Sequence, residues 1–265
     1  MKWKLATGFG ELEATYNLGC QARNEGNFEE AEHWFVKAAE KSYEAAIDNL
    51  CALGNDFYGE GKIEDAKKWW KLSAKFGEID STYNLGVFAR NEGDLEEAQS
   101  WFIKAAEKGH ANACKKIFEV GHDYADRGNL VEAKKSFKLA AQFNHAEAMY
   151  IFGEIARIEE DLDEAQSWFV KAAENQYSGA SESIYRIGVE LLSKDDIEKA
   201  EKVWELAAQF NHAEAMSMLG ALEQHKGNLV GALAWFMKSE ANGYEPAKTD
   251  IKALVTLIES SASDK

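Results

Sequence analysis

The strongest constraint on this fold is an internal repeat with a period of 67 residues. Four segments recur at this period, and they read EEAEHWFVKAAE, EEAQSWFIKAAE, DEAQSWFVKAAE and VGALAWFMKSEA. Each segment contains one alanine and one tryptophan that recur every 67 residues. The alanines, called anchors below, are Ala31, Ala98, Ala165 and Ala232, and the tryptophans are Trp34, Trp101, Trp168 and Trp235. A fixed period indicates stacked repeats, because one unit cannot bury its apolar face alone. Such an array predicts a surface that holds a partner rather than a pocket for catalysis.

The 67-residue period divides into two shorter units. A second set of alanine anchors stands between the first ones, at Ala66, Ala133 and Ala200, so that the spacing alternates between 35 and 32 residues. The chain therefore contains seven units of two kinds. The string LAAQFNHAEAM occurs over 139–149 and again over 206–216, which indicates duplication of a two-unit block.

Each unit is predicted to form two helices. In the first unit, apolar residues spaced by three and four predict helices over 13–25 and 28–41. Gly26-Asn27 interrupts the pattern between them, and Gly or Asn closes the second helix of five units, at Gly77, Gly109, Asn144, Asn211 and Gly243. The three extra residues of the longer units predict a first helix about one turn longer.

These residues lead to a known family. Leu18-Gly19 followed by Ala31, Phe35 and Ala38 resembles the tetratricopeptide repeat. The string W-F-x-K-A-A-E-x-G, followed by Ala four residues later, resembles the Sel1-like repeat more closely and occurs over 101–113. The resemblance covers about residues 12–246. It implies an all-α, right-handed α-solenoid of stacked antiparallel helix pairs, about seven repeats plus a C-terminal capping helix.

The sequence departs from the tetratricopeptide pattern at two places. The proline near the end of each unit is replaced by an aromatic or histidine residue, at Tyr43, His110, His145, Tyr177, His212 and Tyr244. The large aromatic expected three residues after the glycine is alanine at Ala22, Ala89 and Ala156.

The expected domain plan follows from the repeats. We expect a lead segment over 1–12, the seven repeats over 13–246, a capping helix over 247–260 and a disordered tail over 261–265. The capping helix carries Ile251, Leu254, Val255 and Ile258 at helical spacing, as a cover for the last repeat requires. The four tryptophans beside the first alanine anchors are expected in the core.

Charge and cysteine usage limit the classes of partner. The net charge of -16 and the pI near 4.9 argue against nucleic acid and against an anionic membrane surface. Acidity attracts a basic partner, or simply keeps a long array soluble. The three cysteines are widely spaced and form no metal or disulfide motif. A cytoplasmic protein is expected, although a chain without its signal peptide would look the same, so periplasmic or secreted locations stay open.

The sequence contains no motif that predicts catalysis. It has no H-E-x-x-H, no phosphate loop, no G-x-S-x-G and no His pair at metal spacing. The carboxylates fall mainly on outward positions of the second helices, as at Glu29, Glu30, Glu96 and Glu97. We therefore expect no enzyme, no cofactor and no metal.

The arginines suggest where a partner could bind. Arg23, Arg90 and Arg157 each follow the Leu-Gly glycine of their unit by four residues, and Tyr16, Tyr83 and Tyr150 stand seven residues earlier. A tyrosine and an arginine two turns apart share a helix face, and in the resembled family this face lines the concave groove. The predicted concave strip comprises Tyr16, Asn17, Arg23, Asn24, Asn55, Tyr58, Tyr83, Asn84, Arg90, Asn91, Phe118, His122, Tyr150, Arg157, Tyr185 and Arg186.

Two interpretations of this concave strip remain open. Tyr and Arg are typical interface anchors, which favours an adaptor or scaffold that binds a peptide or protein segment in the groove. Alternatively, each arginine pairs with a carboxylate on the next first helix, such as Asp48, and Tyr16 packs between units. A second functional class is an acidic inhibitor or immunity-type protein that occludes a basic toxin or effector. Pairing of two copies through an exposed end also stays open.

Overall fold

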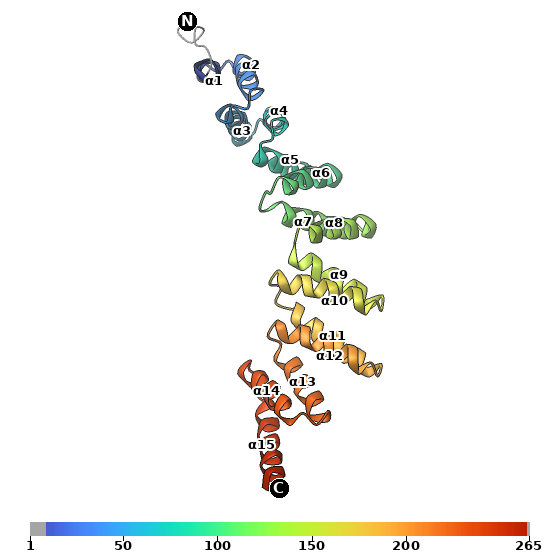
Figure 1. Ribbon diagram of the computed structural model, residues 1–265. Coiled ribbons are helices and arrows are strands. Elements are labelled where there is room, and N and C mark those ends of the chain that lie inside the picture. Colours follow the sequence, from blue (N-terminus) through green and yellow to red (C-terminus); the bar gives the residue numbers. More distant parts are fainter. Residues whose placement is uncertain (1–8, 264–265) are drawn as a thin grey trace. The chain divides into compact units, whose positions relative to one another are not determined.

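The protein is all-α and consists of repeated helix pairs, in a computed structural model that describes residues 9–263 (Figure 1). Fifteen helices and no strands occur in this described range. They are α1 Phe9–Asn24, α2 Phe28–Ala39, α3 Glu44–Gly59, α4 Ile63–Lys75, α5 Ile79–Glu92, α6 Leu95–Glu107, α7 Ala113–Asp126, α8 Leu130–Gln142, α9 Ala146–Ile158, α10 Leu162–Glu174, α11 Ala180–Ser193, α12 Ile197–Gln209, α13 Ala213–His225, α14 Leu229–Ala241 and α15 Ala247–Ser263. The predicted fold class of repeated helix pairs is confirmed.

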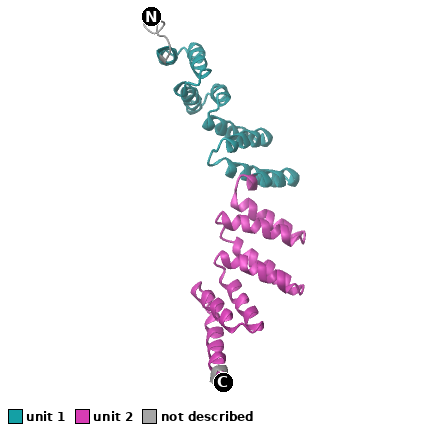
Figure 2. Ribbon diagram, in the orientation of Figure 1, with its two compact units in different colours: residues 1–139 teal, residues 140–265 magenta. Residues whose placement is uncertain are grey.

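The chain forms two compact units, residues 1–139 and residues 140–265 (Figure 2). Unit 1 has a core in which Phe35, Leu50 and Trp70 pack together. Unit 2 has a core that includes Phe169, Ile184 and Trp204. Odd-numbered helices up to α13 are the first helices of their pairs and even-numbered helices are the second.

Each unit has a glycine in its first helix, at the position of Gly19 in Leu18-Gly19, that allows the two helices of a pair to approach closely. A Cβ atom on Gly19 would lie 2.6 Å from the ring of Phe35, and one on Gly86 would lie 2.7 Å from Phe102. The same relation joins Gly54 to Trp70, Gly121 to Phe137, Gly153 to Phe169, Gly188 to Trp204 and Gly220 to Phe236. The repeat therefore needs a residue without a side chain where an aromatic ring of the second helix crosses the first.

This crossing corrects the expectation for the four tryptophans beside the alanine anchors. Phe35 and Phe102 are fully buried, whereas the preceding tryptophans are only half-buried. Trp34, Trp101 and Trp168 donate through Nε1 to a glutamate one turn earlier. A lysine lies over the rings of Trp101, Trp168 and Trp235 at 4.2–4.3 Å from the centroid. The phenylalanine, not the tryptophan, is the core residue of these units.

The turns confirm the predicted breaker residues. Gly77, Gly109, Asn144, Asn211 and Gly243 all have positive φ angles after the second helices. Between the two helices of a pair, the left-handed residue is a glycine in five pairs, at Gly26, Gly61, Gly93, Gly128 and Gly227. In four of these pairs the following Asn or Asp then caps the second helix, as Asp94 does by accepting from the backbone N–H of Glu97 at 2.9 Å, whereas Lys62 after Gly61 makes no side-chain cap.

The longer units do not carry the predicted extra helical turn. Helices α7 and α11 have 14 residues each, as does α5 of a shorter unit, and only α3 is longer, with 16. Most of the extra residues lie in the connection before the first helix, where residues 108–112 separate α6 from α7 but only residues 76–78 separate α4 from α5. A turn absorbs additional residues without moving the buried face of a helix.

The described ends differ slightly from the expected domain plan. Helix α1 begins at Phe9, within the predicted lead segment, and α15 continues to Ser263, within the predicted tail. Residues 1–8 and 264–265 of those two segments lie outside the described residues. Leu254 of α15 is buried against Ala232 and Phe236 of α14, so α15 covers the last pair. In the described part of the chain, no helix combines the length and the apolarity needed to cross a bilayer.

Candidate functional site

The three predicted arginines bridge consecutive first helices. Arg23 of α1 donates to Asn49 and Asp56 of α3 at 2.8 and 2.5 Å. Arg90 of α5 donates to Asp123 and Glu119 of α7. Arg157 of α9 donates to Glu190 of α11 at 3.1 Å and to Glu154 of its own helix. Each bridge joins an arginine to a carboxylate 33 residues later on the next first helix, as the pairing interpretation expects. The partner of Arg23 is Asp56 rather than Asp48.

The bridge at Arg90 is the most extensive of the three. The hydrogen bond that Arg90 donates to Asp123 raises the pKa of Arg90, which keeps the guanidinium charged. Burial alone would raise the pKa of the Glu119 carboxyl, but Lys116 and Arg90 outweigh burial and lower that pKa below its ordinary value. These arginines are therefore already paired, and a partner that used them would have to compete with carboxylates of the same chain.

The predicted tyrosines pack between consecutive helix pairs. Tyr83 stacks on His110 with ring centroids 4.1 Å apart, and Tyr185 stacks on His212 at 4.7 Å. Tyr16 contacts Tyr43 and Tyr150 contacts Tyr177 in tilted arrangements, with ring centroids 5.3 and 4.6 Å apart. The aromatic and histidine residues that replace the tetratricopeptide proline thus provide the surface on which these tyrosines rest. This packing explains why aromatic and histidine residues stand where the tetratricopeptide pattern has a proline.

The α3–α5 junction has a different composition. Tyr58 of α3 follows its glycine, Gly54, by four residues, which is the position that arginine takes in α1, α5 and α9. Phe88 of α5 stands where the next helix would offer a carboxylate. Among the described residues no ion pair joins α3 to α5. An open cavity of about 310 Å³ lies there instead, lined by Asn55, Tyr58, Trp70, Asn84, Val87, Phe88 and Asn91.

The cavity at the α3–α5 junction combines aromatic rings with carboxamides. Trp70 is buried and donates through Nε1 to the carboxamide oxygen of Asn55 at 2.9 Å, and Asn84 donates to the same oxygen at 3.2 Å. Tyr58 is 46% exposed and its ring lies 5.4 Å from that of Trp70. Asn91 is exposed and makes no hydrogen bond to a described residue. The arrangement offers an apolar floor bordered by the carboxamide of Asn91, while the carboxamide of Asn55 is engaged with Trp70, Asn84 and Cys51.

The remaining predicted residues are more scattered. Phe118 is 5% exposed and packs against His122 and Phe137, so it belongs to the core and offers a partner almost no surface. Asn17 is half-buried, whereas Asn24, His122 and Arg186 are exposed. Tyr150, Arg157, Tyr185 and Arg186 belong to unit 2 and the other predicted residues to unit 1. Of the predicted set, the structure brings Asn55, Tyr58, Asn84 and Asn91 together in one cavity.

Reasoning from the sequence missed the aromatic floor of this cavity. Trp70 and Phe88 both line it, but neither belongs to the repeated Tyr-Arg pattern that guided the prediction. A signal was available, because Phe88 stands two residues after Gly86, where Asp56, Asp123 and Glu190 stand in their own units. The other shorter units carry Gln21, Ile155 and Leu222 at this position, so the aromatic ring of Phe88 distinguishes the α3–α5 junction.

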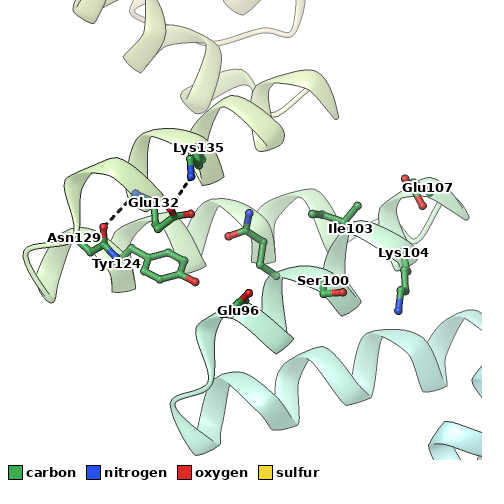
Figure 3. A pocket seen from close by; sticks show the side chains of 10 residues that line it. Glu96, Ser100, Ile103, Lys104, Glu107, Tyr124, Asn129, Glu132 and Lys135 are labelled. Carbon is green, nitrogen blue, oxygen red and sulfur yellow. Dashed lines mark hydrogen bonds and ion pairs between the residues drawn. The ribbon is translucent and has the colours of Figure 1, made fainter.

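A second open cleft of unit 1 lies on the second-helix side, between α6 and α8 (Figure 3). It has a volume of about 770 Å³, and its lining includes Glu96, Glu107, Tyr124, Glu132 and Lys135. Lys135 pairs with Glu132 at 2.7 Å, whereas Glu96 and Glu107 have no ion pair with a described residue. Burial raises the pKa of Tyr124, and the nearby Glu132, Glu96 and Asp94 raise it further. Lys104 also lines the cleft, so its three glutamates exceed its two lysines by one charge.

One cluster in unit 2 contains residue types that bind metals, but the hydrogen bonds of its histidine leave no ring nitrogen available for a metal. Glu182, His212 and Glu214 bring their ligand atoms within 4.8 Å of one another. His212 accepts from the backbone N–H of Ala215 through Nδ1, so the neutral ring carries its proton on Nε2, which faces Glu182 at 2.9 Å. A metal at Nε2 would have to displace that proton and break the cap of α13. These residues do not fit a metal ion.

Comparisons with known proteins agree with the repeat pattern. The Sel1 repeat matches at residues 12–43, 79–110 and 139–177. No curated protein sequence matches the chain significantly. A protective antigen of uropathogenic Escherichia coli with an SLR fold has 23% identity and a TM-score of 0.41, over 92% of this chain and 57% of that one. This chain thus spans little more than half the length of that antigen.

Two further solved structures are similar at the same level. A Sel1 repeat protein from Oxalobacter formigenes has 22% identity and a TM-score of 0.39, over 92% of this chain and 76% of that one. YrrB, described as a TPR protein with an unusual peptide-binding site, has 20% identity and a TM-score of 0.30, over 63% of this chain and 88% of that one. Each of the three matched segments contains a W-F-x-K-A-A-E string, so these segments are Sel1 repeats and the chain is similar to Sel1-like repeat proteins.

Proposed function

We propose that this chain is a non-catalytic scaffold that binds an extended segment of a partner protein at the α3–α5 junction. Repeats of this family generally form scaffolds for protein–protein interactions. The observation that carries the proposal is the cavity at this junction, where Tyr58 and Phe88 occupy the positions that carry an arginine and a carboxylate at the bridged junctions. At the bridged junctions the chain's own charges pair with one another, and even the open depression of about 470 Å³ beside Arg90 and Asp123 is lined mainly by charged side chains, whereas the α3–α5 cavity is lined by aromatic rings and carboxamides.

The chemistry of the cavity indicates which guest fits. The rings of Tyr58, Trp70 and Phe88 favour an apolar or aromatic side chain. Carboxamides present a donor and an acceptor side by side, which matches the peptide group of an extended main chain. The lining residues include no charged side chain, so a neutral segment avoids the cost of burying an unpaired charge.

A selection experiment with a matched pair of variants tests this proposal. Peptides would be selected on the wild-type chain from a random display library, and their affinity measured for Asn91→Ala and Asn24→Ala. Asn24 and Asn91 are both exposed and both follow their Leu-Gly glycine by five residues, but only Asn91 lines the cavity. We expect about tenfold weaker binding for Asn91→Ala, as for a moderate interface contact, and no change for Asn24→Ala. Equal effects of the two substitutions, or peptides that bind elsewhere by chemical-shift mapping, would refute the site.

The acidic inhibitor is a second candidate, supported by the cleft between α6 and α8 (Figure 3). Glu96 and Glu107 face this cleft without an ion pair, and Tyr124 offers a ring on which a guanidinium can stack. A basic partner held there would bind less tightly as salt is added and would lose affinity on Glu96→Gln. A neutral segment at the α3–α5 junction would respond to neither change, so the same two measurements separate the candidates.

A further inference from the structure

The turns of two adjacent pairs in unit 2 contain acidic residues where other pairs have glycine. The left-handed position between the two helices is Glu160 in the α9–α10 turn and Asp195 in the α11–α12 turn, both with a φ of 62°. Five other pairs use glycine there. Residues with a Cβ adopt this conformation reluctantly, so the two side chains are kept at the expense of backbone strain.

The same two turns border an open depression of about 510 Å³. Its lining contains five carboxylates and two lysines together with two leucines, namely Glu159, Glu160, Asp161, Asp163, Asp196, Lys194, Lys199, Leu162 and Leu191. Asp161 and Asp196 also cap α10 and α12. Lys199 lies 3.9 Å from Asp196. The excess of carboxylates gives the depression a negative potential.

Aliphatic side chains are exposed beside this depression. Ile158 is 73% exposed, Leu192 is 37% exposed and Ile197 is 44% exposed, and each is the chain neighbour of a lining residue. Val189, one turn before Leu192 on α11, is 41% exposed. Leu192 also stands four residues after Gly188, where the arginines of α1, α5 and α9 stand. Single exposed aliphatic residues are ordinary, but four at one edge of a helical unit indicate an interaction surface.

We propose that this edge of unit 2 docks a cationic amphipathic segment of a partner protein. Lysine or arginine side chains of the segment pair with Glu160 and Asp163, and its aliphatic residues cover Ile158, Leu192 and Ile197. Charge complementarity selects this occupant, because an acidic segment would be repelled by the lining and a purely polar one would leave the aliphatic side chains uncovered. The surface lies in unit 2 and is independent of the cavity at the α3–α5 junction.

The test uses the full chain and two synthetic peptides. One repeats Leu-Lys-Lys-Leu and the other repeats Leu-Glu-Glu-Leu, each with a fluorescent label read by anisotropy. We expect the lysine peptide to bind and the glutamate peptide not to bind. Glu160→Gly with Asp195→Gly removes one carboxylate that lines the depression and one next to the lining Asp196, and it should weaken binding by about threefold to tenfold, or about threefold for each exposed charge pair. Ile158→Ser should weaken it by about threefold, as expected for one partly covered aliphatic side chain.

Two control pairs separate the proposal from simpler explanations. Gln176→Gly with Asn211→Gly relieves the same left-handed strain in unit 2 without removing charge, because these residues have φ angles of 64° and 60°. It should raise the thermal midpoint, as the acidic pair of substitutions does, yet leave peptide affinity unchanged. Glu29→Gln with Glu40→Gln removes two exposed carboxylates from unit 1 that line none of the cavities described above. If that pair weakens binding as much as the acidic pair in unit 2, only general attraction to an acidic chain remains and the docking surface is refuted.

Discussion

Arg90 and Asp123 form a two-pronged ion pair that ties α5 to α7. The Nη2 atom of Arg90 donates to Oδ1 of Asp123 at 3.1 Å, and its Nε atom donates to Oδ2. A planar guanidinium meets a carboxylate best in this parallel geometry, which a lysine cannot reproduce. The recurrence of an equivalent bridge at Arg23 and Arg157 indicates that these arginines define the spacing of successive first helices.

Loss of this bridge should destabilise unit 1. We expect Arg90→Met to lower the free energy of unfolding by about 1–2 kcal/mol, between the values for exposed and buried ion pairs. Arg186→Met is the control, because Arg186 is exposed and has no ion pair with a described residue, and it should change stability by less than about 0.5 kcal/mol. Urea unfolding followed by circular dichroism measures both. Similar effects of the two substitutions would contradict a bridging role.

The same bridge predicts a dependence on acid. Lys116 and Arg90 outweigh the effect of burial and lower the pKa of Glu119, so its ionised form stabilises the folded state. That contribution is complete above the ordinary carboxyl pKa and is lost as the pH falls through the lowered value. The stability difference between wild type and Glu119→Gln should therefore shrink on acidification below about pH 4.5. Unfolding curves at a series of pH values would show it, and a constant difference would count against the ion pair.

The crossing of Gly86 over Phe102 offers a sharper packing test. A Cβ at Gly86 would lie 2.7 Å from two atoms of a fully buried ring, so Gly86→Ala should cost about 1–3 kcal/mol despite the higher helix propensity of alanine. Gly59→Ala is the matched control in another first helix, because nothing lies within 4 Å of its added Cβ. It should be neutral or slightly stabilising. Thermal melts of the two variants decide the matter, and a harmless Gly86→Ala would show that the crossing is looser than described.

Cys51 predicts a change of stability in alkali. Burial raises the pKa of this thiol from 9.0 to about 11, so the folded state holds the proton more firmly than the unfolded chain. The resulting stabilisation is complete below pH 9 and is lost as the pH rises through about 11. Compared with Cys51→Ala, the wild type should lose about 1–2 kcal/mol over this range. Parallel losses in the two proteins would assign the alkaline effect to other groups.

Much of the architecture could be predicted from the sequence because it depends on local periodicity. The alanine anchors, the Leu-Gly glycines and the Gly or Asn terminators each act within one unit, and the helices and turns follow from them. The prediction that the four tryptophans lie in the core was wrong, because two adjacent aromatic residues on one helix compete for the core. The glycine crossing selects Phe35 over Trp34, and only the geometry of the pair shows which ring meets the glycine.

The candidate site could be predicted less well. Repetition drew attention to Tyr16, Arg23 and their equivalents, yet repeated residues are also those that hold the repeats together. The α3–α5 cavity depends on what is exceptional, with Tyr58 and Phe88 at positions that carry charges elsewhere. Whether such a departure leaves a cavity depends on side-chain sizes across three helices, which spacing along the chain does not report.

The uneven distribution of arginine bridges has a mechanical consequence. Within unit 1, the α1–α3 and α5–α7 junctions each carry a bridge, whereas α3 meets α5 through a hydrogen bond between Asn84 and Asn55 and through apolar contact. The ion pair at this junction comes from the second helix instead, where Lys67 of α4 lies 3.1 Å from Glu92 of α5. Thermal breathing should therefore concentrate between the two first helices, and amide hydrogens of α3 and α5 beside the cavity should exchange with solvent first. A guest wedged between Tyr58 and Phe88 would then stiffen the array by adding a tie between α3 and α5.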